Sequence, residues 1–485
     1  MNALQRLLSN SLLAFVANTI AKVGSSILFI LIGRQMGPAE AGVFNLGVTY
    51  YTILLGLSTL GLHELFVREV APRREKGGHY VLNYMALRLA SSLVVYLGLL
   101  LFLRFNLPYS EETKSVLRIM SLAIFPEAVY SICESLFISH ERQAVPTMSA
   151  LLNAAIRLGA GIFLLNAGAG AGTIAWVIPL STLLSLVIFP LPVLRLLRQT
   201  PDVASPRLDP RFIGRQLLIT PSFMVIHFFS LVDYQTDTFL ISIMLSEAAV
   251  GWYGAAQTIL LVFWIMPRAI RTALYPLMAS YFTHAPDKLE ILYDKSLQYL
   301  FIIALPMVVG VFLLAEPILF LIFGPSFAPS VPVLQWSIWG VIFVFLNVPS
   351  ARLMLLYNRQ SILARMTGIS MATNVGLNLL LIPTYGIVGA AIARLFATVV
   401  FFASNYLYVQ SNLMASVTVW RLMARPILAT LLMALAVLLL RDLPLAIPIL
   451  GGATVFFIAS FALGVVPKED WVYWRTLLRR VDFSK

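Results

Sequence analysis

Charged side chains inside strongly apolar segments are the residues of this sequence that could do chemistry. Asp233 and Asp237 lie in one apolar stretch, and Arg268 and Arg271 lie in the next. A carboxylate or guanidinium at membrane depth costs about 2.5 to 3.5 kcal/mol on insertion scales, so such groups face a bundle interior or a wet cavity. We interpret residues 231–282 as two long helices joined by a polar turn at 246–251, and we expect this pair to line a cavity.

Other apolar segments also carry charges, and together they predict two kinds of site. An anionic head group such as a phosphate or pyrophosphate suits basic side chains, because guanidinium groups bind it bidentately and lysine binds it as a point charge. A buried carboxyl can load a proton in one conformation and release it in another. The expected head-group residues are Lys22, Arg88, Arg157, Arg268 and Arg271, and the candidates for ion coupling are Asp233, Asp237, Glu127 and Glu134.

Two plainer interpretations stay open for the same residues. The acids could simply neutralise arginines on neighbouring helices and fix the helix register. Arg268 and Arg271 could instead extend along the helix surface to the membrane interface.

Signals of an enzyme are absent from the sequence. It contains no G-x-x-x-x-G-K-[ST] phosphate loop and no H-E-x-x-H, and its five histidines are scattered without the spacing of metal ligands. The single cysteine, Cys133, lies in an apolar run and is expected to be a packed thiol. We therefore predict no catalytic residue, no metal and no cofactor.

The composition predicts an all-α polytopic membrane protein. Hydrophobic residues make up 59% of the 485 residues and charged residues only 12%, which is too apolar for a soluble surface. The net charge of +12 could suggest nucleic acid. The basic residues, however, occupy short segments between apolar runs, as membrane topology predicts, so we expect no nucleic-acid binding.

About 20 apolar residues make one crossing, and on that basis the chain has about fourteen transmembrane helices. Their expected centres are residues 22, 52, 92, 126, 155, 184, 228, 262, 307, 343, 373, 396, 432 and 455. Of the 34 basic residues, 24 fall in alternate connections and at the two ends, which predicts that both termini are cytoplasmic. With only Arg6 ahead of it and no cleavage site, the first apolar stretch reads as a span rather than a signal peptide.

Weak internal repeats relate the two halves of the chain. Residues 115–143 match 332–360, and residues 37–47 match 246–256 so that Gly42 lies over Gly251. Asn153 likewise lies over Asn374. The matches predict that helices 7–12 copy helices 1–6 in the same direction, with a site between the copies near the midplane. The expected division is an N-lobe at 1–200, a C-lobe at 212–412, and helices 13 and 14 with a tail at 422–485.

Several segments resemble the polysaccharide-transporter branch of the multidrug/oligosaccharidyl-lipid/polysaccharide exporter superfamily. They are residues 33–47, 58–71, 237–259, 276–280, 321–335 and 374–393, and the resemblance covers about residues 33–397. Phe44 departs mildly from the family, which often has tyrosine there. The most specific part of the pattern is Asn374, Gly376, Asn378, Ile382, Pro383, Tyr385, Gly386, Gly389 and Ala390.

The resemblance implies two six-helix lobes around a V-shaped cationic cavity, alternating access, and two appended C-terminal helices. It also implies a flippase that moves undecaprenyl-(pyro)phosphate-linked oligosaccharide from the cytoplasmic to the outer leaflet for cell-surface polysaccharide export. The expected location is the bacterial cytoplasmic membrane, and the expected partners are the anionic glycolipid, membrane lipid and a proton or sodium ion. We expect a monomer. Of the predicted acids, only Asp237 matches an acid that the family commonly shows inside the membrane.

Three alternatives remain. A cation-coupled drug antiporter of the same superfamily would prefer an acidic and aromatic cavity. A peptidoglycan-precursor flippase of that superfamily would have the same architecture. A membrane glycan polymerase or ligase would need a sizeable external loop with polar catalytic residues, whereas the external connections predicted here are short.

Overall fold

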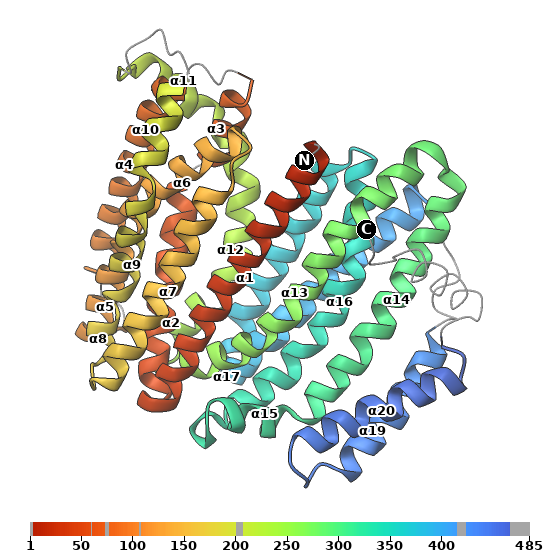
Figure 1. Cartoon of the computed structure of the whole chain (residues 1–485). Helices are drawn as coiled ribbons and strands as arrows, with labels where there is room; N and C mark the ends of the chain where they lie inside the picture. The colour runs from red at the N-terminus through yellow and green to blue at the C-terminus, as the bar shows by residue number, and fades with distance from the viewer. Residues whose placement is uncertain are drawn as a thin grey trace, which may run out of the picture. The chain divides into compact units, whose positions relative to one another are not determined.

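The computed structural model describes residues 3–59, 61–72, 77–105, 108–199, 207–414 and 423–465, and their regular structure is helical (Figure 1). The first unit of the chain comprises Met1–Ala255 and Ile382–Ile387, and the second comprises Ala256–Leu381 and Val388–Lys485. The helices are α1 (Ala3–Met36), α2 (Pro38–Thr59), α3 (Leu62–Val70), α4 (Gly77–Phe102), α5 (Glu111–Ser121), α6 (Ile124–Ser139), α7 (Ala144–Asn166), α8 (Ala171–Ile174), α9 (Val177–Ser185), η2 (Leu186–Ile188), α10 (Pro190–Gln199), α11 (Pro210–Ile219), α12 (Pro221–Met244), α13 (Glu247–His284), α14 (Pro286–Leu313), α15 (Ala315–Ile322), η3 (Pro325–Phe327), α16 (Ser330–Leu356), α17 (Gln360–Asn412), α19 (Ala424–Leu439) and α20 (Ala446–Ala462).

Nine helical stretches in the described ranges are long and apolar enough to cross a membrane, and α19 and α20 are shorter apolar helices. Each of the fourteen predicted centres falls inside a helix. Two of them, at 373 and 396, share the 53-residue α17. The prediction of an all-α multi-pass membrane protein is confirmed, whereas the count of fourteen spans and the lobe boundaries stay predictions.

The first unit packs its apolar helices side by side. α1 lies along α7, α4 along α6, and α2 against α4 and α5. The short helices α3, α10 and α11 gather at one end of this unit and α8 lies at the other (Figure 1). A core of side chains from α3, α4, α6, α10 and α11 holds the first end together, and Cys133 is buried in it as a free thiol.

The second unit has its own apolar core. α14 packs along α16, while α19 and α20 pair with each other, and α19 also packs against α14. The buried side chains at this junction include Ile302, Met433 and Phe456. Helices α19 and α20 correspond to the two helices expected after the lobes.

In the first unit, two glycines allow the start of α2 to lie directly against the start of α13. A Cβ atom on Gly42 would overlap the carbonyl oxygen of Glu247, and one on Gly251 would overlap that of Pro38. The contact is reciprocal, since each such Cβ would also lie 3.0 Å from the backbone nitrogen of the other glycine. Small residues allow this kind of close backbone approach between membrane helices.

The turn that precedes this contact is shorter than expected from the sequence. α12 ends at Met244 and α13 begins at Glu247, so the connection is Leu245 and Ser246 rather than residues 246–251. The residues in the first turns of α13 are mostly small and Glu247 is polar, yet they are helical. The acid Glu247 is favourable at a helix N-terminus.

α17 changes direction within its most specific sequence motif. Gly386 has φ 56° and ψ −138°, a non-helical conformation inside the helix, and Pro383 lies one turn earlier. Only glycine adopts this backbone region without strain, because it has no Cβ. The glycine of the predicted motif therefore has a structural role.

We expect Gly386→Ala to destabilise the protein by about 1–3 kcal/mol, because alanine must take a strained backbone conformation there. We would measure this loss of stability as a melting temperature, the temperature at which the protein purified in detergent ceases to be monodisperse. The matched control is Gly376→Ala on the same helix, where an added Cβ meets nothing within 4 Å. Equal melting temperatures for the two variants would show that the break at Gly386 is not maintained.

We also expect Gly251→Ala to lower the melting temperature, with an overpacking cost of about 1–3 kcal/mol. The atom that the new methyl meets is a backbone oxygen, which cannot move aside as a side chain can. Gly24→Ala on α1 has open space around its Cβ and should melt like the unmodified protein. If both variants melted alike, the α2–α13 contact would not contribute to stability.

Candidate functional site

Arg88 on α4 is the most deeply buried charge of the predicted site. Its side chain is 1% exposed. Its Nη1 donates to Ser58 Oγ of α2 at 2.9 Å and its Nε to Ser131 Oγ of α6 at 3.4 Å. Ser91, one turn further along α4, donates to the Ser58 carbonyl at 2.7 Å. Two neighbouring helices, α2 and α6, therefore supply the hydroxyl groups that fix this guanidinium inside an apolar unit.

Glu127 on α6 connects the buried Arg88 with the partly buried Arg157. It interacts electrostatically with both Arg157 of α7 and Arg88 of α4, and Tyr51 of α2 donates to its Oε2 at 3.4 Å. The Nε of Arg157 is buried without a hydrogen-bond partner, as is Oδ1 of Asn153 one turn earlier on α7. The cluster thus holds one acid between two cations, with donor and acceptor capacity left over.

Glu134 extends this cluster along α6. It lies two turns after Glu127, interacts electrostatically with it, and forms a hydrogen bond with Tyr130. Next to Glu134, Ser135 Oγ lies 2.8 Å from Nδ1 of His63 on α3. The structure therefore brings Arg88, Arg157, Glu127 and Glu134 together in one unit, which we call the N-lobe polar cluster.

Asp237 on α12 is 3% exposed and accepts a hydrogen bond of 2.7 Å from the hydroxyl of Tyr253 on α13. Asp233 lies one turn earlier on α12 and is partly buried. The sequence predicted Asp237 but not its tyrosine partner, which comes from the helix across the turn.

A chain of hydroxyl groups runs beside these residues. Ser242 donates to the carbonyl of Phe239, so Tyr109 donates to Ser242 at 2.8 Å and Tyr50 donates to Tyr109 at 3.0 Å. Burial raises the pKa of the Tyr109 phenol above its ordinary value, which keeps it a neutral donor. These hydrogen bonds connect the loop before α5 to both α2 and α12.

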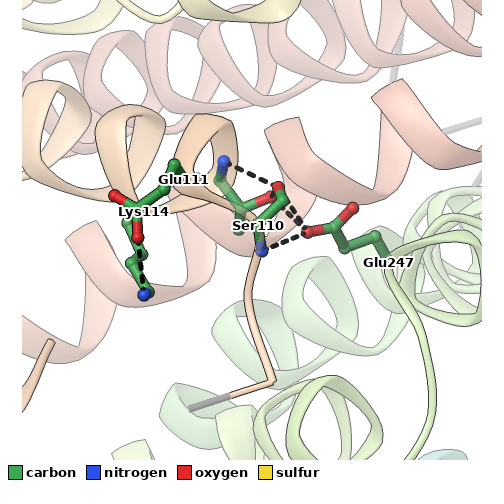
Figure 2. Close-up of polar contacts among 5 residues, drawn as sticks. Ser110, Glu111, Lys114 and Glu247 are labelled. Atoms are coloured by element: carbon green, nitrogen blue, oxygen red, sulfur yellow. Dashed lines mark hydrogen bonds and ion pairs between the residues drawn. The ribbon is translucent and has the colours of Figure 1, made fainter. Parts of the chain in front are cut away.

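Glu247 was not predicted, yet its carboxylate joins two helix starts. Its Oε1 accepts from the backbone nitrogen of Ser110 at 3.4 Å, from Ser110 Oγ at 3.0 Å, and from Thr113 Oγ1 (Figure 2). Ser110 is also the N-cap of α5, accepting from Thr113 N at 3.1 Å. A carboxylate is favourable at a helix N-terminus, and Glu247 occupies that of α5 while starting α13 itself. A nearby ion pair of 2.8 Å joins Lys114 to Glu111 (Figure 2).

In the second unit, two of the described cations, Arg271 on α13 and Arg352 on α16, interact electrostatically with each other. The Arg352 guanidinium lies 5.7 Å from the ring centre of Tyr275, and its Nε is buried without a hydrogen-bond partner. Arg352 was not among the head-group residues expected from the sequence. Two like charges at one place favour an anion between them.

Two predicted head-group residues are not placed in these clusters by any described contact. Lys22 on α1 is exposed, and the side chain of Arg268 lies outside the described part of the structure. The convergence of all five basic residues on one cavity stays a prediction. In the described residues there is no group of three or more His, Cys, Asp or Glu side chains that could hold a metal ion.

Helices of this length and hydropathy, with charged clusters buried between them, define a multi-pass membrane protein of the transporter type. The sequence profile of the family described as "Polysaccharide biosynthesis protein" matches residues 7–282, more than half of the chain. The chain belongs to this family, which confirms the resemblance stated from its motifs.

Relatives and solved structures agree with this assignment. The chain is 22% identical over 397 residues to the probable low-salt glycan biosynthesis flippase Agl15 of Haloferax volcanii, covering 79% of each chain. The fold matches that of the lipid II flippase MurJ in an inward closed conformation, with a TM-score of 0.74, 14% identity and coverage of 96% of this chain and 99% of the other. An inward-facing multidrug resistance MATE family transporter of the MOP superfamily matches with a TM-score of 0.63 and 15% identity, over 81% of this chain and 95% of the other. The chain therefore shares its fold with these two membrane transporters.

We expect Glu127→Gln to destabilise the protein by about 1–3 kcal/mol, because Arg88 and Arg157 lose the carboxylate between them. Thermal unfolding in detergent measures the effect. Glu111→Gln removes an exposed carboxylate whose partner, Lys114, lies on the same short helix, and it should leave the melting temperature unchanged. Equal stability of the Glu127 variant and the unmodified protein would mean that water or ions neutralise the two arginines.

Proposed function

We propose that the protein is a flippase that moves a polyprenyl-(pyro)phosphate-linked oligosaccharide, undecaprenyl-linked in a bacterium, from the cytoplasmic to the outer leaflet. Its role is the export of cell-surface polysaccharide, and it performs no covalent chemistry. The observation that carries the proposal is a pair of arginines, the buried Arg88 and the partly buried Arg157, inside apolar helices of a chain that belongs to the polysaccharide biosynthesis family. The relationship to a probable glycan flippase over 79% of both chains supports it.

The basic residues are proposed to hold the anionic head group while the lipid tail stays in the bilayer. Arg157 retains a buried Nε without a hydrogen bond, and Arg352 does so in the second unit. A phosphate would supply the missing acceptors, because its oxygens bind guanidinium groups bidentately. We therefore add Arg352 to the expected set of Lys22, Arg88, Arg157, Arg268 and Arg271.

The acidic residues are proposed to couple transport to a proton or sodium ion. Glu127 and Glu134 interact with each other in the N-lobe polar cluster, and Asp237 shares a hydrogen bond with Tyr253 on the next helix. Protonation would weaken the attraction between Glu127 and the arginines, freeing them for an anion. The ion would thus bias which conformation binds the head group.

The proposed cycle is alternating access by two lobes, residues 1–200 and 212–412, in the bacterial cytoplasmic membrane with both termini cytoplasmic. In this topology the starts of α2 and α13 and the loop before α5 all lie on the outer side. Their glycine contact and the Glu247 hydrogen bonds would then form an outer closure that parts when the substrate is released. We expect a monomer to be sufficient.

The proposal predicts where substrate accumulates when the gene is deleted. Lipid-linked oligosaccharide should build up on the cytoplasmic leaflet, because its synthesis continues while its transfer stops. Accessibility of the glycan to an added glycosidase or lectin, in sealed right-side-out and inverted vesicles, distinguishes the leaflets. Accumulation on the outer leaflet would instead support a polymerase or ligase.

Complementation of the deletion strain tests the site within the same assay. Arg157→Gln should leave most of the oligosaccharide on the cytoplasmic leaflet at an unchanged protein level. Arg104→Gln is the matched control, since Arg104 is exposed beyond the end of α4 and should restore export. Full export by the Arg157 variant would remove this residue from the head-group site.

A further inference from the structure

The connection between the span that ends in α10 and helix α12 carries exposed arginines with little acidic compensation. The described part of residues 190–220 contains five arginines, all exposed, and one acid, Asp209. Several leucines of the same connection are exposed too, and Leu218 is 83% exposed. We call this set the α10–α11 surface, and it consists of Arg195, Arg198, Arg207, Leu208, Arg211, Arg215, Leu217 and Leu218.

The inner face of α11 fixes which side of the helix points away from the protein. Phe212 packs edge-on against the rings of His79 and Tyr80 of α4, with centroid distances of 5.2 Å. One turn later, Gln216 donates to Glu69 of α3 at 3.3 Å. Contacts at i and i+4 therefore dock one face of the helix on the first unit.

The chain entering α11 is tied to α4 as well. Asn83, whose side chain is fully buried, donates to the carbonyl of Arg207 at 2.9 Å and accepts from the backbone nitrogen of Asp209 at 2.7 Å. Asp209 in turn caps α11, because its Oδ1 accepts from the backbone nitrogens of Arg211 and Phe212 at 2.9 and 3.1 Å. The orientation of the outer face is thus set by the fold.

That outer face combines cations with apolar side chains. Arg211, Arg215 and Leu218 follow each other at i, i+4 and i+7, which makes one stripe along α11. None of the five arginines forms an ion pair within the described residues, and Arg215 contacts only the Phe212 ring as a cation–π pair at 5.9 Å. Helices with arginine on a polar face and leucine beside it lie in the membrane interface, where the guanidinium groups reach the phosphates.

We propose that the α10–α11 surface binds the phosphate head groups of anionic phospholipids and so holds α11 on the bilayer surface. The partner is a lipid surface because the arginines lie at the end of an apolar span, where a headgroup layer is the adjacent environment. Anionic lipid attracts basic segments beside a membrane span, and the attraction is screened by salt. This proposal does not depend on the transported substrate.

The test uses the full-length protein with Cys133→Ala and Gly214→Cys, because Gly214 is exposed on α11 between the arginines and has open space around it. The new thiol is labelled with a fluorophore and the protein is reconstituted in phosphatidylcholine vesicles with about one third phosphatidylglycerol. Bromine quenchers are placed on the acyl chains of either lipid at equal bulk concentration. We expect quenching by brominated phosphatidylglycerol to exceed that by brominated phosphatidylcholine after correction for abundance, with up to about fivefold enrichment per arginine.

Two variants and one control position decide the outcome. Arg211→Gln with Arg215→Gln should abolish the excess, as should high salt, while Arg104→Gln should leave it intact. A label at Gly98→Cys, exposed on the lipid-facing part of α4, should be quenched equally by both lipids. Equal quenching by both lipids at position 214 would overturn head-group recognition, and no quenching there by either lipid would overturn the placement on the bilayer.

Discussion

A charged side chain is stable inside an apolar helix bundle only where other polar groups surround it, and this constraint organises the first unit. Arg88 is held by serines from α2 and α6, and Glu127 lies between two arginines and a tyrosine. These residues come from four helices. Because a lone buried charge costs several kcal/mol, α2, α4, α6 and α7 cannot change their spacing without loss of these partners, so the cluster also fixes the packing of the lobe.

The sequence predicted the charges well and their partners poorly, for a physical reason. An acid or arginine in an apolar segment can be recognised from the sequence alone, and Arg88, Glu127 and Asp237 were found in this way. Their partners Ser58, Tyr51 and Tyr253 lie on other helices, and serine and tyrosine are ordinary residues of membrane helices. Only the pairing of helices in space distinguishes them, and helical periodicity alone does not determine that pairing.

The helices themselves followed from hydropathy, while their boundaries depended on interactions that a hydropathy window does not include. All fourteen expected centres are helical, but the short α3 and α8 escaped a search for 20-residue crossings. The turn after α12 was assigned to residues 246–251 because of its polar and small composition. Glu247 instead starts α13, since its carboxylate accepts hydrogen bonds at the start of α5 and favours its own helix start.

The two ends of the first unit are therefore held together by different kinds of interaction. The contact of α2 with α13 depends on the absence of two side chains and on the hydrogen bonds of Glu247, so it can separate without exposing a buried charge cluster to lipid. The end formed by α3, α10 and α11 is instead held by a continuous aromatic core and by Asn83. Local opening draws on the parts of a structure with the fewest buried apolar contacts, so we expect an opening of this unit to begin at the glycine contact while α11 stays docked.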